Sequence, residues 1–266
     1  MLKDDLGKRM KEYYEQIPKT RLMRRTPVAM RIDGKAFHTF TRGFKKPFDH
    51  ILVETMQETM KALCENIQGC VLGYTQSDEI TLILCDYQTL TTSAWFDYEV
   101  QKMCSVGASM ATLYFNQIFA EKVNDFLFEC ADDPDEEMLI YINTLVNARE
   151  KGAMFDARVF NIPREEVTNL VYWRQQDASK NSIQMVARSL FHHNQLIGKS
   201  SNDLQEMMFQ VHRVNWNDLP TYLKRGSCCV RRVNPDNPTR KVWCIDTEIP
   251  RFVDEGRNYI ENEINF

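Results

Sequence analysis

Long apolar runs are absent from this sequence of 266 residues. No stretch approaches the ~18 consecutive apolar residues that span a membrane, and residues 1–9 lack the apolar core of a secretory signal. An excess of positive charge is also absent, because the formal net charge is −4. Binding to nucleic acid would therefore depend on a local basic patch and not on the average charge. We expect a cytoplasmic protein.

Paired cysteine motifs are lacking too. The eight cysteines include no CxxC pair, and several lie within apolar runs. This spacing favours reduced thiols in the core over a zinc site or a disulfide framework. With 43% hydrophobic residues and no repeat or low-complexity segment, the chain can bury a full core. We expect residues 1–160 to form an α+β core with an N-terminal helix, and residues 161–266 to form a helical and basic extension packed on it as one domain.

Two short stretches carry carboxylates at the ends of expected strands. The stretch that starts at Val28 reads as a buried strand ending in Asp33-Gly34, and residues 73–84 read as two strands joined by a tight polar turn. Between them, Asp49 can cap a helix with one apolar face. A helix over roughly 93–128 and a strand at 155–160 complete a βαββαβ order. This order predicts the split, ferredoxin-like unit, an antiparallel sheet with helices on one face.

The strand order has a chemical consequence. In that unit the first and third strands are antiparallel neighbours, so Asp33 should meet the turn that carries Asp78 and Glu79. Carboxylates arranged in this way suit two magnesium ions roughly 4 Å apart, which activate an attacking oxygen and neutralise a leaving pyrophosphate. Gly34 has no side chain and lets its backbone approach metal or phosphate. Cations that suit a phosphate tail are Lys35, His38, Lys46 and Lys102.

Each of these motifs also has a simpler interpretation. An Asp-Gly after a strand is usually a turn, and a Ser-Asp-Glu is usually a solvated hairpin tip. His38 would by default be a partly buried histidine, and Lys46 a surface group. Ser77 has no histidine or aspartate arranged to make it a nucleophile, so a serine hydrolase is a poor fit. The acidic run 131–137 lacks EF-hand spacing, which favours an exposed loop or helix start over a calcium site.

Two basic segments are candidates for contact with RNA. The first follows an expected N-terminal helix closed by Pro18, and it contains Lys19 together with Arg21, Arg24 and Arg25. The second is the tail beyond residue 210, which contains Lys224 and Arg225 among its cations. Such charge runs are more often solvated surfaces than phosphate sites. A binding module without catalysis would rely on these segments alone.

A family resemblance connects the motifs. The sequence contains, in order, Arg31-Ile-Asp-Gly-Lys-Ala-Phe-His38, Lys46-Pro47, Tyr74-Thr-Gln-Ser-Asp-Glu79, Asp156-Ala-Arg-Val159 and Trp173-Arg-Gln-Gln-Asp177. In order and approximate spacing this set resembles the tRNA-histidine guanylyltransferase superfamily. The resemblance covers most of the chain and implies a polymerase-like palm that uses two magnesium ions to add nucleotides to the 5′ end of tRNA, opposite in direction to ordinary polymerases. It also implies a homotetramer whose subunits share one tRNA.

The resemblance implies roles residue by residue. Asp33, Gly34 and Asp78 match metal ligands, with Glu79 beside them as an essential acid. The nucleotide-binding set that it implies is Asp33, Gly34, Lys35, Ala36, Phe37, His38, Lys46, Ser77, Asp78, Lys102 and Arg158, with GTP, ATP and other nucleoside triphosphates as substrates. For RNA the candidates are Arg21, Arg24, Arg25, Lys180, Asn181, Lys224 and Arg225.

The sequence departs from the eukaryotic members of this family at two places. Ser179 stands where they have a histidine, and Asp203-Leu-Gln-Glu206 stands where they have Asp-Lys-Asn-Glu. The pattern is closer to the bacterial and archaeal type, which resembles template-directed 3′-to-5′ polymerases that repair 5′-truncated tRNAs after ATP-dependent adenylylation of a 5′ monophosphate. The alternatives are a nucleotide cyclase or diguanylate-type palm enzyme, although no GGDEF-like signature is present, and the non-catalytic RNA-binding module.

Overall fold

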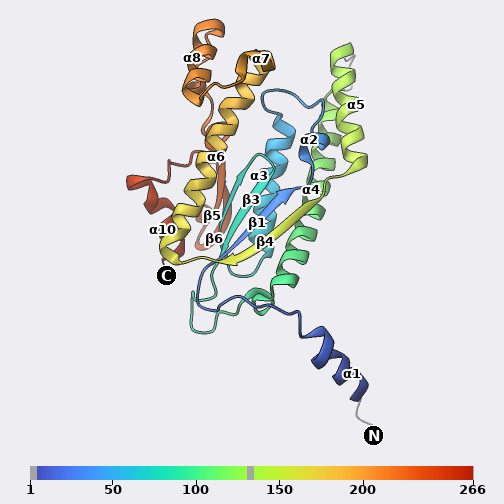
Figure 1. The fold of residues 1–266 in the computed structure, drawn as a ribbon, viewed down its shortest axis with the longest axis vertical. Coiled ribbons are helices and arrows are strands. Elements are labelled where there is room, and N and C mark those ends of the chain that lie inside the picture. The colour runs from blue at the N-terminus through green and yellow to red at the C-terminus, as the bar shows by residue number, and fades with distance from the viewer. Residues whose placement is uncertain (1–4, 131–134, 266) are drawn as a thin grey trace.

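A six-stranded antiparallel sheet is the centre of the computed structural model, which describes residues 5–130 and 135–265 (Figure 1). The strand order is β4-β1-β3-β2-β5-β6. The strands are β1 (Val28–Gly34), β2 (Cys70–Gln76), β3 (Glu79–Leu84), β4 (Phe155–Asn161), β5 (Ser227–Asn234) and β6 (Asn237–Asp246). Because β1 lies between β3 and β4 and is antiparallel to both, the predicted split unit is confirmed. Strands β5 and β6 extend the sheet beyond β2.

Two long helices cover one face of the sheet. Helix α3 (His50–Asn66) begins at Asp49, whose Oδ1 accepts a hydrogen bond from the Leu52 amide at 3.2 Å, as the capping pattern predicts. Helix α4 (Val100–Glu129) lies beside α3. The strand residues on this face, such as Met30 and Leu82, are fully buried against both helices. This face therefore holds the larger core.

The opposite face is covered by the C-terminal part of the chain. Helix α6 (Arg164–Leu190) and helix α10 (Asn258–Ile264) pack on a second core that includes Ala29, Ile83 and Val171. The helices of the split unit do lie on one face, as expected, and the extension adds helices to the other. A strand buried on both faces needs apolar residues on both, which is why Val28-Ala-Met reads as a continuous apolar run.

The remaining elements are short or stand away from the sheet. They are α1 (Asp5–Met10), the π-turn η1 (Lys11–Glu15), α2 (Phe37–Phe40), η2 (Trp95–Tyr98), α5 (Glu136–Lys151), α7 (His193–Leu196), α8 (Ser201–His212), η3 (Trp216–Asp218), α9 (Thr221–Arg225) and η4 (Asp254–Arg257). Figure 1 shows α1 projecting from the body at the end opposite α5 and α8. None of the helices within the described ranges is long and apolar enough to cross a membrane. All eight cysteines are unpaired, and five of them are buried.

One helix start differs from the sequence prediction. The helix expected from residue 93 begins at Val100, because Phe96, Asp97 and Tyr98 have left-handed φ values near +50° and interrupt it. The acidic run 131–137 lies partly outside the described residues. Its end starts α5, where Asp135 Oδ1 accepts a hydrogen bond from the Met138 amide at 2.8 Å.

Candidate active site

Charged side chains form two rows on the sheet face that α6 covers. Asp33 on β1 lies opposite Glu79 on β3 and Asp156 on β4, so three acids share one row. Arg31, two residues before Asp33, lies opposite Arg158 on β4 and forms the next row. Residues in register, or two apart on one strand, face the same side of a sheet. The strand pairing therefore places an acidic row beside a basic one.

The β2–β3 turn brings a fourth acid to this end of the sheet. Its first residue, Ser77, has φ of +51°, and the Ser77 hydroxyl donates to Asp78 Oδ1 at 3.1 Å. The Gly34 amide donates to the Asp78 carbonyl at 3.0 Å. The end of β1 and the turn are thus held together through their backbones, and Asp33 and Asp78 belong to one site.

Both of these carboxylates are destabilised as anions. Burial raises the pKa of Asp33 above its usual value, and the charges of Glu79 and Asp156 raise it further, against the opposing effect of Arg158 and Arg31. Burial also raises the pKa of Asp78, with further contributions from the charges of Asp33 and Glu79. Among the described residues, the cation within 4.0 Å of Asp33 is Arg158, whose Nη2 lies 4.0 Å from Asp33 Oδ2 and 3.1 Å from Asp156 Oδ1. A further positive charge at this point would stabilise both anions.

The donor set fits magnesium in the way that nucleotide enzymes use it. Across residues 5–130 and 135–265, no three histidine, cysteine, aspartate or glutamate side chains are grouped closely enough to hold a metal by themselves. Magnesium, however, is commonly held by one or two carboxylates and by substrate phosphates that complete its octahedron. Asp33, Asp78 and the Gly34 carbonyl supply such a partial set. Their assignment as ligands stays a prediction.

Glu79 is bound differently from the other acids. Its Oε2 accepts from Arg31 Nη2 at 2.6 Å and its Oε1 accepts from Arg174 Nε at 2.7 Å. Arg174 on α6, Arg31 and Asp156 were not predicted as site residues. Their roles depend on the register of three strands and on how α6 packs. All three residues lie within the motifs that carry the family resemblance, and the two-residue spacings from Arg31 to Asp33 and from Asp156 to Arg158 indicate shared strand faces.

The loop after β1 divides its residues between core and surface. Phe37 is 5% exposed and packs on Phe115. Lys35 and His38 are exposed, so the simpler interpretation of His38 as a partly buried histidine is wrong. Ala36 has φ of +53° and is the N-cap residue of α2. A Cβ at Gly34 would lie 2.2 Å from the Phe37 ring, so this glycine is required by packing. Lys35 and His38 remain free to face a ligand beside Asp33.

Two cavities share part of their lining, and the first of them adjoins the β2–β3 turn. One of about 100 Å³ lies between α3, α6 and α9, with Ser77, Gln57 and Asn181 among its polar lining and Met56 and Met185 among its apolar lining. The other, of about 900 Å³, lies between residues 43–50 and the start of α5, and exposed Lys46 lines it. Phe48 and Leu223 line both cavities. A cavity with space for an apolar group therefore lies next to a cavity in which Lys46 could bind an anion.

Lys102 lies away from these residues. It is in the first turn of α4, and its Nζ is 5.0 Å from the centroid of the Phe96 ring. Thr112 of the same helix is level with the end of β1, because its hydroxyl accepts from the amide of Phe155, the register partner of Gly34. Ten helical residues correspond to about 15 Å. Contact of Lys102 with the triphosphate stays a prediction. Within one chain, Lys102 lies too far along α4 from the end of β1 to support it.

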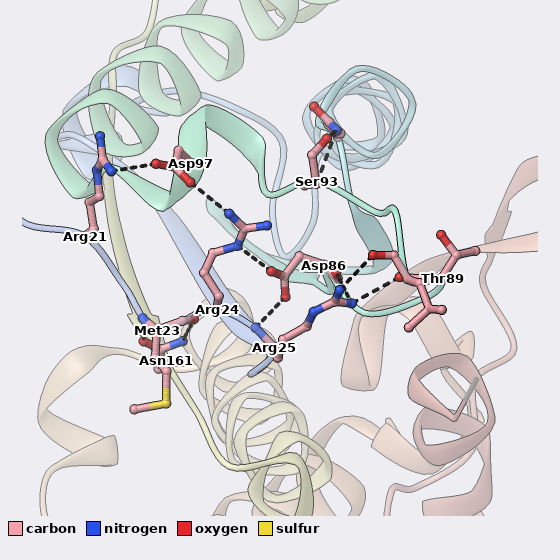
Figure 2. A network of polar contacts seen from close by, with 11 residues as sticks. Arg21, Met23, Arg24, Arg25, Asp86, Thr89, Ser93, Asp97 and Asn161 are labelled. Atoms are coloured by element: carbon pink, nitrogen blue, oxygen red, sulfur yellow. Dashed lines mark hydrogen bonds and ion pairs between the residues drawn. The ribbon is translucent and has the colours of Figure 1, made fainter.

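The N-terminal arginines are engaged within the molecule (Figure 2). Arg24 Nε donates to Asp86 Oδ2 at 2.7 Å, and Arg21 and Arg24 both bind Asp97, at 2.7 and 2.8 Å. Arg25 donates through its amide to Asp86 and through its guanidinium to the Thr89 and Leu90 carbonyls. These contacts attach residues 20–27 to the β3–α4 connection. Binding of RNA by these arginines stays a prediction. The charges of Arg21 and Arg24 are already paired with Asp97 and Asp86, whereas the Arg25 guanidinium is held by backbone carbonyls.

The other RNA candidates lie around α6 and α9. Lys180 and Arg225 line a polar pocket of about 560 Å³ together with Arg251, whereas Asn181 faces the cavity beside Ser77. Lys224 Nζ donates to the Asn217 carbonyl at 2.5 Å. Lys180, Arg225 and Arg251 form no ion pair with any residue that the structure describes. Three uncompensated cations in one pocket are compatible with a phosphate contact.

Comparison with known proteins gives this site a family. The model of the family described as "Thg1: tRNAHis guanylyltransferase" matches residues 7–163, more than half of the chain. This protein belongs to the tRNAHis guanylyltransferase family. A solved structure titled as a bacterial tRNA(His) guanylyltransferase (Thg1)-like protein in complex with ATP is 40% identical, covers 98% of this chain and 100% of that one, and has a TM-score of 0.80.

Further relatives agree with the family assignment. A similar bacterial structure in complex with GTP is 38% identical, covers 99% of this chain and 100% of that one, and has a TM-score of 0.78. A probable tRNA(His) guanylyltransferase of Dictyostelium discoideum is 23% identical over 91% of this chain and 89% of its own. The family and these relatives identify the chain as a nucleotidyltransferase, and the predicted α+β architecture is confirmed.

Proposed function

We propose that this protein is a magnesium-dependent nucleotidyltransferase that adds nucleotides to the 5′ end of tRNA in the 3′-to-5′ direction. The observation that carries the proposal is the convergence of Asp33 and Asp78, two carboxylates with raised pKa values, beside the arginine row. Membership of the family supports the reaction class. The relatives bound to ATP and GTP support both nucleotides as ligands.

Different residues of this chain would bind the magnesium, the nucleobase and the phosphates. Asp33, Asp78 and the Gly34 carbonyl would hold magnesium, which supplies charge neutralisation on phosphate oxygens and activates an attacking hydroxyl. The cavity beside Ser77 suits a nucleobase, because its lining is largely apolar with a few polar groups. Arg31, Arg158 and Lys46 lie around the carboxylates and the cavities, where they would bind phosphates as fixed positive charges.

The proposed transfer forms one phosphodiester bond and breaks one phosphoanhydride. The 3′ hydroxyl of an incoming nucleoside triphosphate attacks the 5′ phosphorus of the RNA, and its proton passes to solvent. A 5′ triphosphate releases pyrophosphate. A 5′ monophosphate is first joined to the adenylyl group of ATP, which releases pyrophosphate, and the later attack releases AMP. The product carries a new 5′ triphosphate and can react again.

The physiological reaction that we propose is template-directed repair of 5′-truncated tRNAs in the cytoplasm. The likeness to bacterial Thg1-like proteins supports this choice over strict modification of histidine tRNA. So do Ser179 and Asp203-Leu-Gln-Glu206, which depart from the eukaryotic pattern. Asp203 instead forms the capping box of α8, where its carboxylate accepts from the Ser200 amide at 2.8 Å.

A panel of tRNAs lacking one 5′ nucleotide, with each of the four bases opposite the gap, tests the proposal. We expect magnesium-dependent incorporation of the complementary nucleotide, at least about 10²-fold faster than with the Asp33→Asn variant. Asp236→Asn, an exposed substitution of the same kind in the β5–β6 turn, is the matched control and should react like the wild type. Cyclised nucleotide as the product, or RNA binding without incorporation, would replace the proposal with one of its two rivals.

We also propose a homotetramer, and the N-terminal arm supports assembly with further copies. The arm consists of α1, η1 and residues 16–17, and it buries no side chain in its own chain. Its exposed apolar residues include Leu6, Tyr13, Tyr14 and Ile17, which are 60–75% exposed. Light scattering should give about four times the 31.3 kDa of one chain. Deletion of residues 1–17 should lower that mass, and an unchanged mass would remove the arm from the interface.

A further inference from the structure

Glu79 is the acid of the site with the fewest free acceptor positions. Its side chain is 7% exposed, and each of its oxygens accepts a short hydrogen bond from a different arginine. The Thr81 hydroxyl adds a longer contact to Oε1 at 3.4 Å. A carboxylate bound by two guanidinium groups at 2.6 and 2.7 Å has its charge compensated before any metal arrives. Glu79 therefore differs from Asp33 and Asp78, neither of which accepts an arginine hydrogen bond from the described residues.

The two arginines bound by Glu79 come from different parts of the fold. Arg31 belongs to β1 and Arg174 to α6, so the carboxylate connects the central strands to the helix that covers them. Arg174 also binds Asp177 Oδ2 at 2.8 Å. Both guanidinium groups lie over the ring of Trp173, at 5.3 and 4.4 Å from its centroid. A planar cation held on two sides loses most of its rotamer freedom.

Arg31 keeps one donor without a partner. Its side chain is 15% exposed, and its Nε is buried with no hydrogen-bond acceptor among the described residues. A buried N–H without an acceptor is unfavourable, because the group has lost its hydrogen bond to water and gained none in the protein. Arg31 lies in the row next to Asp33 and opposite Arg158, so an oxyanion bound at the carboxylates could supply the missing acceptor. The orientation of Arg31 is thus fixed by Glu79 and not by the group that its Nε would bind.

The contact between Arg174 and Glu79 also affects the cavity beside Ser77, because helix α6 lines that cavity. Residues Ala178, Asn181 and Ser182 of α6 line this cavity, one to two turns after Arg174. The distance between α6 and the β2–β3 turn is therefore set in part by the bond from Arg174 to Glu79. Both the phosphate side and the base side of the site depend on one buried carboxylate.

We propose that Glu79 is a positioning residue, which holds Arg31 and α6 in place for the transfer step and does not bind magnesium. The inference rests on the proposed function, since Arg31 and the cavity matter only if a nucleotide is transferred here. It departs from the role of Glu79 as a catalytic acid that the motif implied. Its consequence is that loss of Glu79 and loss of Asp33 should have different signatures.

Magnesium titrations separate the two roles. Glu79→Gln keeps the shape of the side chain and removes the charge that holds both arginines. We expect its kcat for transfer to fall about 10²-fold, while the magnesium concentration that half-saturates GTP binding changes by less than about twofold. Asp33→Asn should shift that concentration at least about tenfold. A tenfold shift in Glu79→Gln, or an unchanged kcat, would overturn the proposal.

A second variant acts on the other partner in case Glu79→Gln does not fold. Arg174→Lys keeps the charge but cannot place Nε on Glu79 and a second nitrogen on Asp177 together. It should lower kcat without changing the magnesium requirement, and an unchanged kcat would count against the proposal. Circular dichroism checks folding in each variant. If the wild type binds GTP but transfers nothing to any RNA, the proposed function fails, and the magnesium titration still decides whether Glu79 is a ligand.

Discussion

At the scale of single residues, Asp78 lies in the candidate active site, and its charged carboxylate destabilises the folded protein. Burial and the charges of Asp33 and Glu79 raise the pKa of its carboxyl in the folded protein above the value in the unfolded chain. The folded state therefore holds the proton to higher pH, and stability falls as the pH rises through the interval between the two pKa values. The full penalty applies above the folded pKa and is absent below the unfolded one.

Asp78→Asn should therefore stabilise the ligand-free protein while abolishing transfer. The amide has the same shape and carries no charge at any pH, so its melting temperature should exceed that of the wild type near neutral pH. The difference should shrink as the pH falls from neutral toward the ordinary aspartate pKa of about 4, because the raised pKa of Asp78 makes its carboxyl take up a proton over this interval. Differential scanning calorimetry across this range, with Asp236→Asn as the control, measures the effect. A lower melting temperature for Asp78→Asn near neutral pH would contradict the assignment of a raised pKa.

Some residue roles could be predicted from the sequence, and others could not. The meeting of Asp33 with the turn at Asp78 follows from strand order, which apolar patterning and turn residues define well. The binding of Glu79 by Arg31 and Arg174 depends on register and on the rotation of α6, to which local patterns are insensitive. The same limit applies to Arg24, which reads as a basic surface residue and in the structure binds fully buried Asp86.

At the scale of elements, the segment of residues 20–27 illustrates how charged residues can hold a chain in place. Asp86 lies two residues after the end of β3, and its side chain is 0% exposed. Its carboxylate accepts hydrogen bonds from Arg24 Nε and from the Arg25 amide. Asp97 is 50% exposed and binds Arg21 and Arg24 in solvent. The two acids bind the same segment but differ in burial, which offers a direct comparison.

Replacement of each acid by alanine should separate buried from exposed ion pairs. Asp86→Ala leaves the Arg25 amide without its acceptor and should lower the free energy of unfolding by about 1–3 kcal/mol. Asp97→Ala should lower it by no more than about 1 kcal/mol, because its pairs are solvated and screened by salt. Urea denaturation of both variants measures the difference. Equal effects would mean that burial does not determine the strength of this network.

The left-handed turn at residues 96–98 explains why α4 begins later than the sequence pattern predicts. Apolar periodicity continues through Trp95 and Phe96, so a helix from about residue 93 fits the pattern. Three consecutive residues with positive φ are costly for side chains other than glycine. Arg21 and Arg24 bind the middle residue, Asp97, and help to hold this backbone. A contact from a distant segment overrides the local preference.

At the scale of the whole molecule, the sheet joins the two parts into which the sequence was divided. Strand β5 of the second part pairs with β2 of the first, with Gly73 opposite Cys229 and Thr75 opposite Ser227. Helix α6 buries Val167 and Val171 against the sheet face that carries Ala29 and Ile83. Without residues 161–266, that apolar face and the backbone groups of β2 would be exposed to water.

Residues 1–160 and 161–266 should consequently unfold together and not as separate domains. We expect the full chain to unfold in one cooperative transition by calorimetry, with equal calorimetric and van't Hoff enthalpies. A fragment of residues 1–160 should fail to fold, because it exposes one whole face of its sheet and an open strand edge, which favours aggregation. Far-UV circular dichroism of the purified fragment, with a thermal scan, measures this. A cooperative melt of residues 1–160 alone would instead show that the first part holds its fold unaided, and that α6 and Arg174 join the catalytic sheet as a separable layer.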